Sequence, residues 1–276
     1  MEAAKAKRPW MGRGWMLQYL LAGDPIFTAG RWDWWLSVEG IPEGPIPYLG
    51  FVSPSFDTEP VDLKDKIPVK FGRLTPDGAY RHLRGLLDKM GDSWGSLRFL
   101  MEWLAYGLGV EDEMPTGEPD ESHEMLYREF QLPRLQAARA DVFGRLFSEN
   151  IGGGWNPNAF FPTPANVIEC MVQMTMHDGM DKIDSVCDPC CGTGRMLLHA
   201  SNYSVNLWGM DIDRMCVLAT KINAALFMPW LIAPKLDRGI QDPDETSKTR
   251  VAQGHPPLPK QFRTEKNGQL LLFEEV

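Results

Sequence analysis

The chain lacks a long apolar segment, and it has no excess of positive charge. No apolar run approaches the roughly 20 residues of a membrane-spanning helix, and no apolar signal-peptide core follows the charged residues at 1–8. The chain has 28 Lys and Arg residues and 37 Asp and Glu residues, and the resulting formal net charge of −9 would repel nucleic acid. We therefore expect a cytosolic protein with no membrane contact, whose contact with any DNA is local or partner-assisted.

Cysteine and histidine are also scarce. Five cysteines in 276 residues do not form a disulfide framework, so reduced thiols are expected. Cys187, Cys190 and Cys191 have a spacing that could supply two ligands to tetrahedral zinc. A second pair of ligands is lacking, and the five histidines are scattered singly. Zinc is therefore the disfavoured alternative for this segment.

The residues around these cysteines predict a strand, a glycine turn and a helix. Ile183 to Cys187 is a short apolar run, and Arg195 to Ala200 has helical spacing. Gly192 and Gly194 between them permit positive φ and the close approach of a ligand. The helix that begins there would direct unpaired N–H groups back toward the turn.

A second strand follows and ends in an acid. Val205 to Met210 predicts this strand, and Asp211 comes directly after it. In doubly wound folds, an acid in this position holds a ribose through its hydroxyls. The glycine turn and the acid together predict binding of a nucleoside-bearing cofactor.

Two motifs carry a resemblance to a known family. Asp188-Pro189-Cys190-Cys191-Gly192-Thr193-Gly194 resembles the S-adenosylmethionine (SAM) loop of amino-directed, adenine-specific DNA methyltransferases, and Phe161-Pro162-Thr163-Pro164 resembles their Phe-x-Thr-Pro element. Within that family the chain most resembles the methylation subunits of type I restriction-modification systems. In those subunits a helical segment like 141–147 leads through glycines into Phe-x-Thr-Pro. The resemblance covers roughly residues 125–228.

The resemblance implies SAM as cofactor, DNA as substrate, and an α/β fold with a partial Rossmann-like core. It places Phe161 and Thr163 near the methionine end of SAM, Asp188 at its amino group and Asp211 at its ribose. SAM carries no phosphate, so the site needs no phosphate-binding loop. Its ammonium group is positively charged and can pair with an acid such as Asp188. The implied cofactor site consists of Phe161, Thr163, Asp188, Pro189, Gly192, Gly194, Asp211 and Ile212.

The sequence departs from the family after the second strand. The family has a further strand that ends in an Asn/Asp-Pro-Pro-aromatic turn, which is not evident here, and the nearest string is His255-Pro256-Pro257-Leu258. Residues 183–234 can hold only two or three of about seven strands. We therefore expect a core truncated after the second strand, with unknown catalytic residues. The chain is either a reduced methyltransferase, from a bacteriophage or mobile element and dependent on a partner subunit, or an inactive homologue acting in recognition, inhibition or tethering.

Composition divides the chain into four regions. Residues 1–70 are rich in Trp, Pro and Gly, 71–150 are mainly helical, 151–234 hold the SAM-binding core, and 235–276 form a tail. The aromatic run at 31–35 either stacks on bases or belongs to a core or a docking surface, and the acids among its neighbours favour the core or docking surface.

Capping signals predict the helices before the motifs. Thr75 and Pro76 begin a helix that stops at Gly91, and Ser93 caps a second helix that ends at Gly109 and packs on the first as a hairpin. The acidic stretch 111–124 is expected to be a solvated loop. Residues 125–147 should be helical, with a break at Pro133.

Two further helices are expected around the predicted strands. Thr163 should cap the first, whose Val167, Ile168, Met171 and Val172 would face the sheet. The second follows Asp213 and ends near Pro229.

The tail holds one apolar peptide. Residues 235–268 are polar and without periodicity, which predicts disorder. The terminal Gln269-Leu270-Leu271-Leu272-Phe273 resembles the Gln-Leu-x-Leu-Phe peptide that bacterial proteins insert into the replicative sliding clamp. Its anchors would be Gln269, Leu270, Leu272 and Phe273, and the alternative is a terminal strand that packs on the domain.

Overall fold

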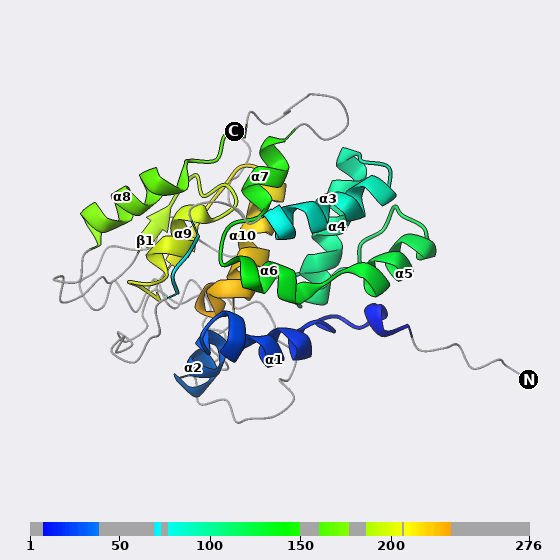
Figure 1. Cartoon of the computed structure of the whole chain (residues 1–276), viewed down its shortest axis with the longest axis horizontal. Helices are drawn as coiled ribbons and strands as arrows, with labels where there is room; N and C mark the ends of the chain where they lie inside the picture. The colour runs from blue at the N-terminus through cyan, green and yellow to red at the C-terminus, as the bar shows by residue number, and fades with distance from the viewer. Residues whose placement is uncertain are drawn as a thin grey trace, which may run out of the picture.

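The computed structural model of the protein describes residues 8–38, 69–72, 77–149, 160–176, 186–205 and 207–232. No helix within these ranges is long and apolar enough to cross a membrane. The predicted segments 235–268 and 269–273 lie outside them, as do Gly152 to Gly154 and the first residues of the first predicted strand. The elements, in chain order (Figure 1), are η1 (Pro9–Met11), α1 (Leu17–Phe27), α2 (Arg31–Val38), α3 (Asp77–Lys89), α4 (Trp94–Gly107), α5 (Asp120–Glu129), α6 (Leu132–Ala138), α7 (Phe143–Ser148), α8 (Ala165–Thr175), β1 (Val186–Asp188), α9 (Arg195–Ala200), β2 (Leu207–Gly209), α10 (Arg214–Phe227) and η3 (Pro229–Leu231).

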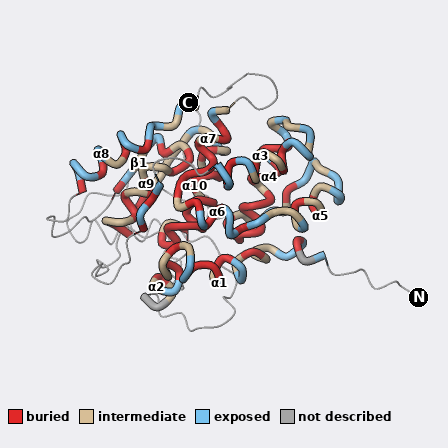
Figure 2. The backbone as a smooth tube through the Cα atoms, in the orientation of Figure 1, coloured by how far each residue is buried: buried red, intermediate tan, exposed pale blue. Residues whose placement is uncertain are grey.

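Helix α10 lies at the centre of the fold and packs against α4, α6, α9 and η3 (Figures 1 and 2). Asp213 caps it, because its Oδ1 accepts a hydrogen bond from the Met215 N–H at 2.8 Å. The helix ends at Phe227, close to Pro229, as predicted. From Leu218 onward almost every residue of α10 is buried, so this helix is part of the core rather than an amphipathic cover.

The two strands pair in parallel around a crossover helix. Val186 lies opposite Leu207 and Asp188 lies opposite Gly209. Helix α9 connects the strands and packs against both, and α8 packs on α9. A parallel pair joined by a helix is a βαβ unit, so the structure agrees with the α/β character predicted for this region. The partial Rossmann-like core stays a prediction.

The N-terminal aromatic run lies in the core. Trp32 and Trp35 are buried, and Trp34 is half-buried. The Trp32 indole N–H donates to the main-chain oxygen of Ala225 in α10 at 2.7 Å. The core interpretation of this segment is therefore confirmed over base stacking, since these rings face protein.

The predicted helical hairpin is present. Helices α3 and α4 contact each other, and Ser93 caps α4 by accepting from the Ser96 N–H at 3.0 Å. Gly109 has φ +76° just beyond the last turn of α4. The predicted start of α3 at Thr75 and Pro76 lies outside the described residues.

The prediction of a loop through residue 124 was wrong for its last five residues. Helix α5 begins at Asp120, after Pro119 in an extended conformation. Asp120 and Glu121 lie in its first turn, where acids are stabilised by the unpaired N–H groups of a helix N-terminus. Leu126 then packs into the core, which the charge count alone did not indicate. The predicted break near Pro133 is confirmed, because α6 restarts at Leu132.

The prediction that Thr163 caps the next helix was also wrong. Pro164 is the N-cap of α8, and no side chain caps it. A residue before proline is held extended, so Thr163 stays one position outside the helix. The predicted buried face is half correct, because Ile168 and Val172 are buried whereas Val167 and Met171 are exposed. The helix rests on α9 through a narrower stripe than the sequence indicated.

Candidate functional site

Two acids meet at the carboxyl ends of the parallel strands. Asp188 ends β1, and Asp211 follows β2 after Met210. The main chain joins the two ends, because the Met210 N–H donates to the Asp188 oxygen at 2.9 Å and the Cys191 N–H donates to the Met210 oxygen at 2.8 Å. The βαβ pairing therefore brings both acids to one edge of the sheet.

The glycine turn lies against the second acid. Gly192 has φ +54° and donates its N–H to Asp211 Oδ2 at 2.8 Å, while Asp211 Oδ1 accepts from the Asp213 N–H at 2.9 Å. Gly194 has φ +80° and is the residue from which α9 begins. Asp211 thus fixes the turn and keeps acceptor capacity, because each carboxylate oxygen can accept two hydrogen bonds.

The electrostatics of Asp188 suit a cationic ligand. Partial burial raises the pKa of the Asp188 carboxyl, the Cys190 N–H bond at 3.2 Å lowers it in part, and the charge of Asp211 raises it further. A positive group placed between the two carboxylates would reduce their mutual repulsion and favour the ionised form of each. Pro189, the next residue, is exposed in the turn.

The Phe-x-Thr-Pro element lies beside the same turn. A Cβ on Gly192 would be 3.0 Å from the ring of Phe160, so the residue directly before the element lies against the turn. Phe161 is 82% exposed and Ile212 is 90% exposed, whereas most large apolar side chains of the described residues are at least half-buried. Thr163 is exposed, and its main-chain oxygen accepts from Arg195 Nη1 at 2.9 Å.

A pocket of about 350 Å³ opens next to this element. Pro162 and Ala165 line it, whereas Asp188 and Asp211 do not. Titratable side chains from separate segments also line it, namely Asp77, Asp141, Arg145, Arg195 and His199. The predicted cofactor residues therefore surround an open edge of the sheet rather than this pocket.

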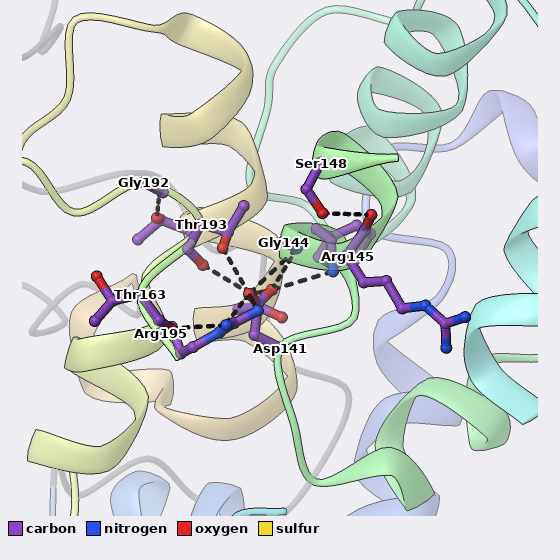
Figure 3. A network of polar contacts seen from close by, with 11 residues as sticks. Asp141, Gly144, Arg145, Ser148, Thr163, Gly192, Thr193 and Arg195 are labelled. Atoms are coloured by element: carbon purple, nitrogen blue, oxygen red, sulfur yellow. Dashed lines mark hydrogen bonds and ion pairs between the residues drawn. The ribbon is translucent and has the colours of Figure 1, made fainter. Parts of the chain in front are cut away.

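Sequence reasoning missed the roles of Asp141, Thr193 and Arg195, which form one largely buried network at the turn (Figure 3). Asn223 belongs to the same network, because it donates to Asp141. Asp141 was noted only as part of a helical segment. A carboxylate in an otherwise apolar stretch was the available signal, because a buried acid needs partners.

The cysteines of the turn differ in burial. Cys187 and Cys190 are exposed, whereas Cys191 is buried with its Sγ 3.6 Å from Thr220 Oγ1. Burial raises the pKa of the Cys191 thiol to about 12. Among the described residues, no group of three or more His, Cys, Asp or Glu side chains is arranged to hold a metal.

A βαβ unit with a glycine turn between two strand-ending acids has the features of α/β proteins that bind nucleoside cofactors. Residues 152–228 match the family described as N-6 DNA Methylase. This segment, which holds the Phe-x-Thr-Pro element, the turn and both acids, is therefore similar to adenine-specific DNA methyltransferases. No curated protein and no solved structure matches the chain.

Proposed function

We propose that the chain binds SAM at the edge of the sheet and acts as a DNA adenine methyltransferase-like protein. The observation that carries the proposal is that Asp188 and Asp211 lie at the adjoining carboxyl ends of two paired parallel strands, with the Gly192 N–H bonded to Asp211. The family match over 152–228 supports the same cofactor and DNA as substrate.

Each residue has a distinct role in the proposed site. Asp188 would face the ammonium group of SAM, and Asp211 would accept hydrogen bonds from the ribose hydroxyls. Gly192 and Gly194 would let the main chain approach the cofactor. Phe161 and Ile212, both highly exposed beside the turn, would gain contacts on the apolar parts of the ligand. SAM itself would supply the activated methyl group.

Calorimetry with SAM and its demethylated product tests the proposal. Asp211→Ala should weaken binding by about 1.5 to 3 kcal/mol, because a charge-assisted hydrogen bond is lost. Glu121→Ala removes an exposed acid on the distant helix α5 and should leave affinity unchanged. Equal affinity of the Asp211→Ala variant and the parent would contradict the role of Asp211.

A second function is favoured by the absence of an evident Asn/Asp-Pro-Pro-aromatic turn in the sequence. Methylation within a duplex requires a flipped base whose amino group is held by such a polar platform. The chain would then bind SAM without transferring methyl groups alone, serving in recognition, inhibition or tethering. In a restriction-modification system, a partner subunit would supply the catalytic turn.

A methyl-transfer assay separates these functions. The purified chain should not label duplex DNA with radioactive SAM, and His255→Ala serves as the matched variant because His255 is the nearest substitute for the missing motif. Label incorporation by the parent but not by His255→Ala would assign catalysis to the tail segment. Incorporation only after addition of a partner subunit would support the divided enzyme.

We also propose that the terminal peptide binds a sliding clamp. Leu272 and Phe273, with Gln269 and Leu270, would insert into the groove of the ring, as short extended peptides do. A ring threaded on DNA would hold an acidic protein near the duplex by effective concentration. A pull-down with the host clamp tests this, since a chain ending at Gly268 should lose retention and Glu274→Ala should not.

A further inference from the structure

A buried carboxylate outside the matched segment lies under the glycine turn. Asp141 follows α6 and is 4% exposed. Its Oδ1 accepts from the N–H groups of Phe143 and Gly144 at 3.1 Å each. These two bonds hold the side chain against its own main chain, so its orientation is fixed before the other partners are considered.

The remaining donors come from the glycine turn, α9 and α10. Thr193, between the two glycines of the turn, donates its hydroxyl to Asp141 Oδ2 at 2.7 Å (Figure 3). Arg195, the first residue of α9, donates from Nε at 3.1 Å and from Nη2 at 3.0 Å to the same oxygen. Asn223 of α10 donates to Oδ1 at 3.0 Å. One carboxylate thus joins three separate elements.

The same donors reach further into the site. Arg195 Nη1 donates to the Thr163 oxygen of the Phe-x-Thr-Pro element at 2.9 Å. Asn223 Nδ2 also donates to the Thr193 main-chain oxygen at 2.8 Å. Removing the acceptor at Asp141 would therefore release side chains that hold both family motifs.

The absence of a side chain at Gly144 gives the ion pair its space. A Cβ on Gly144 would lie 2.3 Å from Asp141 Oδ2 and 2.5 Å from Arg195 Nη2. A side chain at this position would therefore displace one or both members of the ion pair. The Arg195 side chain is 17% exposed and that of Asp141 is 1% exposed, so water screens this pair little.

We propose that Asp141 is a positioning residue for the cofactor turn. It acts through Thr193 and Arg195, and it makes the helical region before residue 152 a working part of the site. The identity of the ligand in this inference rests on the proposed function, whereas the ordering of the turn does not.

Asp141→Asn in the full chain tests the inference, with hydrogen exchange of the 192–195 amides and calorimetry with SAM as separate readouts. The amide keeps the shape of the side chain but places an N–H group or a weaker acceptor before Thr193 and Arg195. Exchange in the turn should accelerate at least tenfold, and the Kd for SAM should rise about 10- to 100-fold. Asp77→Asn, an exposed acid on the wall of the neighbouring pocket, is the matched control and should change neither.

A double-mutant cycle with Arg195→Gln separates positioning from general loss of stability. Asp141→Asn should have a smaller effect on turn exchange in the Arg195→Gln background, because the shared interaction is already absent. A folded Asp141→Asn protein with parental exchange in the turn would overturn the inference. If Asp141→Asn does not fold, Thr193→Val removes a single donor, and unchanged turn exchange in that variant would overturn it equally.

The two proposals fail in different ways. A parent protein that does not bind SAM contradicts the proposed function, while the exchange of the turn amides still decides the role of Asp141. A parent that binds SAM with the same affinity as a folded Asp141→Asn variant contradicts only the positioning role.

Discussion

Arg31 Nη1 in α2 donates a hydrogen bond to the main-chain oxygen of Phe227, the last residue of α10, at 2.8 Å. The same nitrogen donates to Ser201 Oγ at 2.8 Å, and the guanidinium lies 5.1 Å from the centre of the Trp230 ring. Burial lowers the pKa of Arg31 to about 9, which the charge of Asp24 partly offsets. The N-terminal helices are therefore joined to the segment 152–228 by a buried cation, Arg31.

Arg31→Ala should destabilise the protein by about 3 to 5 kcal/mol, because it leaves buried polar partners unsatisfied and creates a cavity. Urea denaturation monitored by tryptophan fluorescence measures this difference. Arg98→Ala, which removes an exposed pair with Glu102 one turn away, should change stability by less than about 0.5 kcal/mol. Similar losses in the two variants would show that the buried contacts of Arg31 contribute little.

Gly194→Ala should destabilise the turn for two reasons that a control can separate. Gly194 has φ +80°, where alanine costs about 1 to 2 kcal/mol, and its Cβ would lie 2.9 Å from both Cγ2 and Oγ1 of buried Thr220. Overpacking adds about 1 to 3 kcal/mol, so the total loss should be roughly 2 to 5 kcal/mol in thermal denaturation.

Gly30→Ala provides the matched control for that prediction. Gly30 has φ +79°, and a Cβ added to it would have nothing within 4 Å, so only the backbone cost of about 1 to 2 kcal/mol should appear. Equal destabilisation by both substitutions would show that Thr220 moves away without cost.

Local signals predicted the elements around the turn because their physical causes lie within a few residues. Asp213 and Ser93 cap the helices that follow them, and α9 has the predicted bounds 195–200. Gly192 and Gly194 both adopt the positive φ that their place between a strand and a helix indicates. In these cases short-range geometry decided the conformation.

Long-range contacts decided the parts that sequence reasoning did not reach. Arg31 pairs with residues 170 to 196 positions away, and Asp141 meets Thr193 and Asn223 only after folding. The charges of Asp120 and Glu121 indicated a solvated loop. In the structure these acids occupy the first turn of a helix whose Leu126 packs into the core. Residue spacing and composition do not identify which distant residues meet in the folded chain. The network around Asp141 could therefore not be predicted from the sequence alone.

The five cysteines should react with a thiol reagent in a defined order. Cys170 and Cys190 are exposed and should be labelled first, because the reagent reaches them. Cys187 is exposed, but burial of its sulfur and the charge of Asp188 raise its pKa, so it should follow. Cys191 and Cys216 are buried with raised pKa values and should react only on unfolding. Mass spectrometry of a time course checks the order, which early labelling of Cys191 would contradict.

The raised pKa of Asp188 predicts opposite pH dependences for ligand binding and for folding. A cationic ligand binds the ionised carboxylate, so the affinity for SAM should fall by up to about tenfold for each pH unit below the raised pKa. The folded chain without ligand binds this proton more tightly than the unfolded chain. The stability from this group is therefore fully present below the unfolded pKa of about 3.9, and it is lost as pH rises through the folded pKa.

Asp188→Asn removes the titration while keeping an oxygen that accepts from the Cys190 N–H. At pH 7 this variant should be more stable than the parent without ligand, because burial and the charge of Asp211 no longer act on an ionised group. The difference between the two proteins should shrink as pH falls toward the ordinary carboxyl range, and SAM binding by the variant should be weak and independent of pH. Thermal denaturation and calorimetry between pH 4 and 8 measure both quantities. A parent whose affinity for SAM stays constant across this range would show that the ionised form of Asp188 does not contact the ligand.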